Sequence, residues 1–167
     1  MDRIIAMYEL ITARLNVVGE WLPPFFLRAI LAFEYWEAGI MKFNGDNWFS
    51  HIKGDFPFPF NVINVDISWF LATWFEILGA VGLLIGLFTR FFSVSLIVLT
   101  IVATLAVHWP NEWSTLGELW NGYAITAKES GAGNFKLPLL FMIMLLPLLF
   151  SGPGKLSLDH LIKKWVD

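Results

Sequence analysis

The chain has 167 residues, of which 57% are hydrophobic, 17% aromatic and 15% charged. A soluble domain usually carries about 25% charged residues, and a core of this size has no room for so many large apolar side chains. The composition therefore favours a membrane protein and excludes a disordered chain, a collagen-like fibre and a disulfide scaffold. The net charge of −3, without a basic stripe, argues against a nucleic-acid partner.

The first predicted element is an amphipathic helix over about residues 4–18, lying on the membrane surface. Its apolar side chains recur at helical spacing, at Ile4, Tyr8, Ile11, Leu15 and Val18. A signal peptide is not expected here, because Asp2, Glu9 and Arg14 interrupt the segment.

Four apolar segments follow, and each is predicted to be a membrane-spanning helix. They cover about residues 24–41, 67–88, 91–108 and 135–150. Gly79, Gly82 and Gly86 give the second segment a face of small residues, which predicts close helix packing. A short C-terminal helix is expected after the fourth segment, with Ser157 as its N-cap and Asp159 in its first turn.

The connections 44–66 and 109–134 are predicted to be long loops on one side of the membrane, rich in aromatic residues that favour the interface. The expected fold is therefore all-α. It is a single membrane domain over residues 1–167, a four-transmembrane-helix bundle with an N-terminal amphipathic helix and a short C-terminal helix.

The distribution of Lys and Arg predicts that both termini are cytoplasmic. The side that holds both termini carries six basic residues, and the other side carries four. The six are Arg3, Arg14, Arg90, Lys155, Lys163 and Lys164.

Charged residues inside the predicted spans are the candidate functional residues, because charge in a bilayer is costly and usually faces the bundle interior. One face of the first span carries Arg28, Ala32, Tyr35, Gly39 and Lys42. Glu34 and Glu37 fall on a roughly opposite face, at about 100° per residue. Both faces cannot point at lipid, so we expect this span to be central or the protein to oligomerise along one face.

The position of each residue along its predicted span gives its depth in the membrane. By this measure four groups that can carry protons lie in the outer half of the bundle, where they could converge: Glu34, Glu37, Glu76 and His108. Exchange between quinone and quinol moves two electrons and two protons within the membrane. It needs an apolar slot and a carboxylate or imidazole near the ring oxygens. These four residues are therefore the predicted catalytic groups. A metal site is less favoured, because the Glu-x-x-His pattern of carboxylate metal bundles is missing.

Each of these residues also has a purely structural interpretation. Arg28 would anchor its helix by snorkelling to the interface, and Glu76 would pair with Arg28 or Lys42. A protonated Glu34 or Glu37 would form a hydrogen bond between helices, and His108 would lie at the interface.

The chain contains no cysteine and no glycine-rich nucleotide fingerprint. Thiolate catalysis, iron–sulfur clusters and haem attachment through cysteines are therefore excluded. Haem held by two histidines would need a second histidine inside a span. If electrons pass through this protein, a partner or a diffusible reductant supplies them.

Three stretches together resemble the DoxX family of small four-helix integral membrane proteins. They are LRAILAFEYWEAGIMKF, EILGAVGLLIGLFTRF and SGPGKLSLDHL. The resemblance implies a bundle in the bacterial inner membrane and a link to quinone-coupled oxidation of sulfur compounds. It also implies that Arg28, Lys42, Glu76 and Arg90 are the polar positions of the family, whereas Glu34, Glu37 and His108 rest on geometry alone.

The leading hypothesis is a quinone-interacting subunit of a membrane oxidoreductase system, without a redox centre of its own. Arg28, Lys42 and Arg90 would bind the quinone, with no metal assigned. The alternative is a non-catalytic scaffold or accessory protein that docks a partner through the loops 44–66 and 109–134. A protein partner or a homo-oligomer is expected in either case. A weaker third hypothesis is transport of a small solute or a metal.

Overall fold

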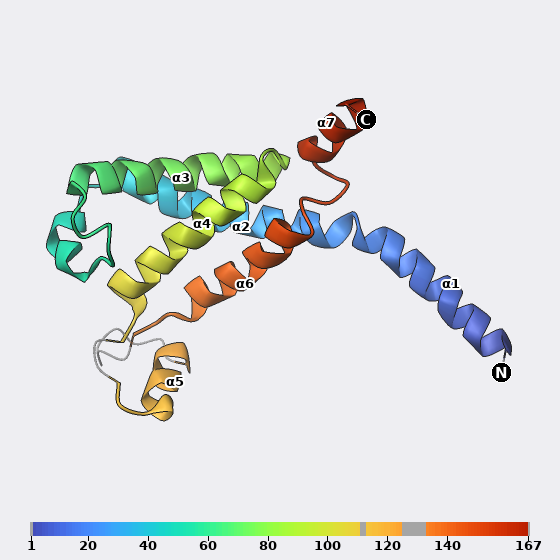
Figure 1. The fold of residues 1–167 in the computed structure, drawn as a ribbon, viewed down its shortest axis with the longest axis horizontal. Coiled ribbons are helices and arrows are strands. Elements are labelled where there is room, and N and C mark those ends of the chain that lie inside the picture. The colour runs from blue at the N-terminus through green and yellow to red at the C-terminus, as the bar shows by residue number, and fades with distance from the viewer. Residues whose placement is uncertain (1, 111–112, 125–132, 167) are drawn as a thin grey trace.

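The computed structural model describes residues 2–110, 113–124 and 133–166, and these residues form helices and no strand (Figure 1). The all-α prediction is therefore confirmed. The helices are α1 (Asp2–Gly19), α2 (Leu22–Asn44), α3 (Val65–Ile85), α4 (Thr89–Ala103), α5 (Leu116–Ala124), α6 (Lys136–Phe150) and α7 (Leu158–Val166). A 3₁₀ helix covers Phe49–Asp55, and a π-helical turn over Thr104–His108 extends α4.

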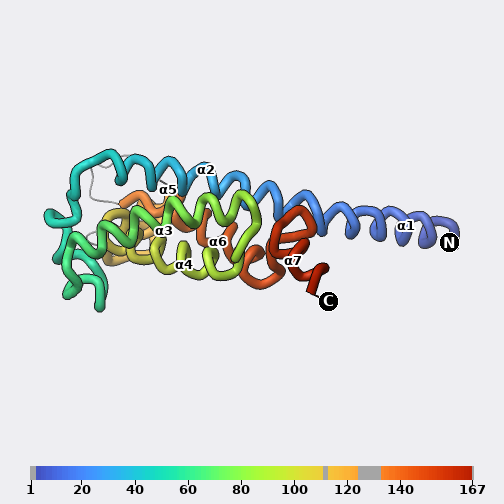
Figure 2. The backbone as a smooth tube through the Cα atoms, turned by 90° about the horizontal axis from the view of Figure 1, so that it is seen from above, coloured from blue at the N-terminus to red at the C-terminus, as the bar shows by residue number. Residues whose placement is uncertain are grey.

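Helices α2, α3, α4 and α6 pack around one set of buried side chains, and we call these four helices the helical core. Helix α3 runs along α2, α4 runs along α6, and α3 and α4 are joined by a short turn (Figures 1 and 2). The buried apolar residues at its centre are Leu31, Ala32, Tyr35, Ala80, Leu83, Leu96, Leu145 and Leu148.

Two helical segments are long and apolar enough to cross a membrane, Val65–Ile85 and Thr89–His108. Helix α6 is equally apolar but has only 15 residues. Helix α2 is 23 residues long, and its charged side chains lower its hydropathy. Membrane character is thus supported, and the crossing by α2 and α6 stays a prediction.

Helix α1 projects away from the helical core, and it packs on the core mainly at the junction with α2 (Figures 1 and 2). All the apolar side chains of its predicted stripe are exposed, for example Tyr8 at 70% and Leu15 at 63%. Such a surface is stable only when another apolar phase covers it, and the membrane interface is the predicted cover.

The two predicted loops contain local structure. The connection before α3 holds the 3₁₀ helix, whose Phe49 is buried against Phe56 and Trp69. The connection after the π-helical turn contains α5, although residues 111–112 and 125–132 of this loop lie outside the described residues.

Small residues allow close approach between helices of the core. A Cβ atom at Gly39 of α2 would lie 2.7 Å from Ile77 Cγ1 and 3.1 Å from the backbone nitrogen of Ile77 on α3. A Cβ atom at Gly82 would lie 2.4 Å from the ring of Phe92 on α4. The close packing predicted for the glycine face of α3 is therefore confirmed.

We expect Gly39→Ala to destabilise the protein by about 1–3 kcal/mol, because the added methyl group meets backbone as well as side chain. The matched control is Gly19→Ala at the end of α1, where a Cβ atom would have nothing within 4 Å. Thermal unfolding in detergent, followed by circular dichroism, measures the difference. Equal melting temperatures for the two variants would contradict the tight approach of α2 and α3.

Candidate functional site

An ion pair between Lys42 and Glu76 joins α2 to α3 inside the helical core. The lysine Nζ donates to both carboxylate oxygens of Glu76, each at 2.8 Å. The two side chains are 12% and 5% exposed. Gly39, one turn before Lys42, brings α3 close enough for this contact, so Lys42 rather than Arg28 is the partner of Glu76.

Tyr35 links α2 to α4 through a buried hydrogen bond. Its hydroxyl lies 2.6 Å from Thr100 Oγ1. The Thr100 hydroxyl already donates to the carbonyl of Leu96 at 2.7 Å, so Tyr35 is the donor in this pair. Together with the Lys42–Glu76 pair, this hydrogen bond gives α2 a buried polar link to both α3 and α4.

Arg28 makes a second link between α2 and α3, nearer the end that holds both termini. Its guanidinium is fully buried and donates to the carbonyls of Leu83, at 2.9 Å, and Leu84, at 3.1 Å. It also donates to the carbonyl of Leu156, in the segment before α7. The last carbonyls of a helix lack intrahelical partners and carry partial negative charge. We call this arrangement the arginine clamp. Because the Arg28 side chain is buried, the interpretation of Arg28 as a snorkelling anchor is wrong.

The turn between α3 and α4 is held by residues from the C-terminal segment. Gly86 has a φ of +70°, and a Cβ atom there would lie 2.6 Å from Arg28 Nη1. Asp159 accepts from the backbone amides of Phe88, at 2.8 Å, and Thr89, at 2.9 Å, and so caps the start of α4. Ser157 Oγ accepts from the His160 amide at 3.2 Å, which confirms Ser157 as the N-cap of α7.

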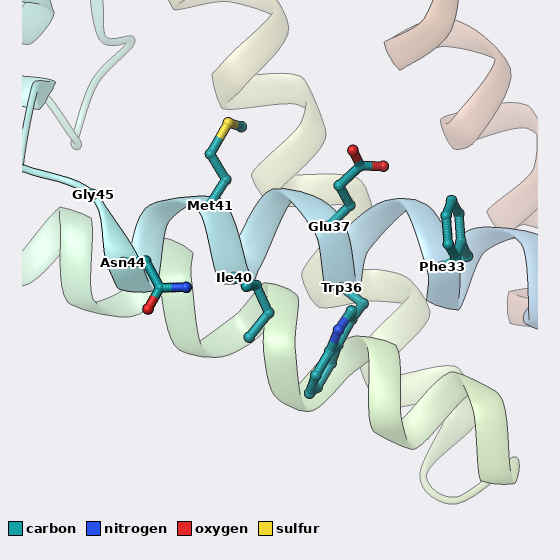
Figure 3. A pocket seen from close by; sticks show the side chains of 7 residues that line it. All are labelled: Phe33, Trp36, Glu37, Ile40, Met41, Asn44 and Gly45. Carbon is teal, nitrogen blue, oxygen red and sulfur yellow. The ribbon is translucent and has the colours of Figure 1, made fainter.

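An open groove lies on the outward side of α2 (Figure 3). Phe33, Glu37 and Met41 project on one side of the helix, and Trp36, Ile40 and Asn44 project on the other (Figure 3). Gly45 completes the lining. The Glu37 side chain is exposed, and Glu34 is half-buried. This exposed face is one along which the protein could oligomerise, as expected from the sequence, and that covering stays a prediction.

The predicted catalytic residues do not form one cluster. Glu76 is bound to Lys42, and Glu37 lines the groove. His108 ends the π-helical turn, with its Nδ1 2.6 Å from Asn134 Oδ1. Across residues 2–110, 113–124 and 133–166, no three His, Asp or Glu side chains lie close enough to hold a metal ion. The sequence placed all four at similar depth, but depth does not fix the direction in which each side chain points.

Of the residues predicted to bind a cofactor, Arg28 and Lys42 are engaged inside the helical core, as described above. Arg90 is exposed near the end of α6 and donates to the carbonyl of Phe150 at 3.3 Å. The sequence missed the cap that Asp159 makes on α4. The signal was present, because an aspartate suits the N-terminus of any helix, but spacing assigned it to its own helix.

We expect Lys42→Met to destabilise the protein strongly, by about 3–5 kcal/mol, because it leaves the Glu76 carboxylate buried without its partner. The double variant Lys42→Met/Glu76→Gln should recover a large part of that loss. Thermal unfolding in detergent of the wild type, both single variants and the double variant measures the coupling. Additive losses would show that the pair is not coupled.

Comparison with known proteins gives the chain its family. The DoxX family model matches residues 24–109, more than half of the chain. An uncharacterized protein of Haemophilus influenzae is 39% identical over 151 residues, which cover 90% of each chain. No solved structure matches the chain. The matched region contains the arginine clamp residue, the Lys42–Glu76 pair and the groove on α2, and the chain belongs to the DoxX family.

Proposed function

We propose that this DoxX protein is a quinone-interacting subunit of a membrane oxidoreductase system. In this proposal α2, α3, α4 and α6 form a four-transmembrane-helix bundle in the bacterial inner membrane, with both termini cytoplasmic. The observation that carries it is the groove on α2, which the exposed Glu37 lines together with Trp36, Ile40 and Met41.

Exposure of Glu37 to lipid would be costly, so a bound molecule that accepts its hydrogen bond or its proton would stabilise it. A quinone ring suits both the apolar side chains and the carboxyl group of the groove. Its flat apolar faces pack on aromatic and aliphatic side chains, and its carbonyl oxygens accept hydrogen bonds.

Reduction of the quinone to the quinol consumes two electrons and two protons. The electrons come from a partner subunit or a diffusible reductant, because the sequence offers no redox cysteine or haem-attachment motif. In this proposal Glu37 transfers protons at the ring oxygen, and Glu34, three residues earlier on α2, exchanges protons with it. Lys42, Glu76 and Arg28 are positioning residues that hold α2 against α3.

We expect Met41→Trp to fill the groove and raise the Kd of a short-chain ubiquinone at least about tenfold, the cost of losing one well-packed apolar contact. The matched control is Ile30→Trp, at another exposed position of α2 that does not line the groove. Native mass spectrometry of protein in nanodiscs measures retained quinone and the Kd. Unchanged binding in Met41→Trp, or equal loss in both variants, would refute the groove as the quinone site.

Glu37→Gln keeps the shape of the groove but removes the acid. We expect quinone to remain bound, while quinone-linked turnover of membranes that carry the protein and its partner falls about 100-fold, as for loss of a general acid. Glu9→Gln, which removes an exposed carboxylate from α1, should leave turnover unchanged. Full turnover in Glu37→Gln would remove its proton-transfer role.

A scaffold without chemistry is the second candidate. It is favoured by the pairing of Arg28, Lys42 and Glu76 inside the chain, which is typical of a structural role. The groove would then receive a helix of a protein partner or of a second copy, since its two rows repeat every four residues. Loss of co-purification with the partner in Met41→Trp, with no quinone retained by the wild type, would support the scaffold instead.

A further inference from the structure

A cavity lies at the end of the helical core from which α1 and α7 extend, away from the C-terminal half of α2 that carries the groove. Its walls come from the junction of α1 and α2, the turn between α3 and α4, the segment after α6, and α7. Its charged and titratable lining residues are Glu20, Arg90, Lys155, Asp159, His160 and Lys163. None of them lines the groove on α2 that is the proposed quinone site. Arg90 is the one that the sequence had assigned to cofactor binding.

The walls of this cavity are fixed by contacts between distant parts of the chain. The backbone amide of Lys155 donates to the carbonyl of Glu20 at 2.9 Å, and the two side chains form an ion pair. Asp159 is held by the amides at the start of α4, and its own amide donates to the carbonyl of Gly86 at 2.9 Å. The cavity is therefore built by the fold and is not a gap between independent surface side chains.

The charges in the cavity do not balance. Three cations line the cavity, Arg90, Lys155 and Lys163, against two carboxylates, Glu20 and Asp159. The Glu20 carboxylate pairs with Lys155, and the Asp159 carboxylate accepts hydrogen bonds from two backbone amides. Within the described part of the chain, no carboxylate forms an ion pair with Arg90 or Lys163, and Arg90 donates only to the Phe150 carbonyl. The lining thus carries one more cation than carboxylates, and this excess favours binding of an anion beside Arg90 and Lys163.

The position of the cavity indicates which anion. The apolar segments α3 and α4 meet at its edge, and Phe88 and Phe91, which line it, are 65% and 57% exposed. Exposed apolar rings at the ends of apolar helices face the lipid phase, so the charged residues of the cavity beside them lie at the level of the lipid headgroups when α3 and α4 span the membrane. Basic pockets between helices at this level suit phospholipid headgroups.

We propose that this cavity binds the headgroup phosphate of an anionic phospholipid, with Arg90 and Lys163 as its cationic ligands and Phe88 and Phe91 against the acyl chains. The chemistry recognised is a phosphate group, which free phosphate would share. The lipid is favoured as its source because the cavity opens beside exposed apolar side chains.

The test uses the full chain in detergent, titrated with phosphatidylglycerol or phosphatidylcholine and followed by native mass spectrometry. We expect tighter binding of phosphatidylglycerol. In Arg90→Gln/Lys163→Gln its Kd should rise about 30-fold, since each cation near an anionic lipid contributes roughly a factor of five. Lys164→Gln is the matched control, because Lys164 is the neighbouring cation on α7 but does not line the cavity.

Arg90→Lys/Lys163→Arg keeps both charges and should retain binding, which separates loss of the site from loss of the fold. Equal affinity for the two lipids, or an equal loss in Lys164→Gln, would overturn the proposal. Full displacement of phosphatidylglycerol by millimolar inorganic phosphate would overturn the lipid as the source of the phosphate. Failure of quinone binding to the groove would leave this result unaffected, because the two sites share no lining residue.

Discussion

Charge buried in an apolar helical core must find its partners inside the protein, and this constraint organises the structure. Two such arrangements join α2 to α3, one near each end. The arginine clamp uses helix-terminal carbonyls as its partners, and Lys42 uses a carboxylate. Neither group could be left unpaired without a cost of several kcal/mol. Together they fix both the register of α2 against α3 and its rotation about its own axis.

The rotation of α2 determines what the rest of the surface presents. Once Arg28 and Lys42 face α3, Glu37 can only point outward, together with Trp36 and Met41. The groove is therefore a consequence of the buried pairs, and its carboxylate is displayed because of them. A helix with one polar face buried and another polar face exposed is expected where a second molecule completes the structure.

Much of this could be predicted from the sequence. Apolar length and helical spacing indicated an all-α chain, and the shared face of Arg28, Tyr35 and Gly39 is the buried face of α2. Periodicity succeeds here because it depends only on local geometry. The choice of Lys42 as the partner of Glu76 depends on the register between two helices, which the sequence of each helix alone leaves open. Asp159 capping α4 depends on a contact across 70 residues.

Asp159 and Leu156 contact the turn between α3 and α4 and the arginine clamp beside it, and this affects the order of folding during synthesis. Both residues follow every helix of the helical core along the chain. As the chain is made, α2, α3 and α4 therefore exist first with the amides of Phe88 and Thr89 uncapped and with one hydrogen bond of the arginine clamp missing. The hairpin of α3 and α4 therefore gains these contacts only after α6 and the segment that follows it have been made. The contacts that the C-terminal segment makes with the turn between α3 and α4 are thus among the last of the fold to form during synthesis.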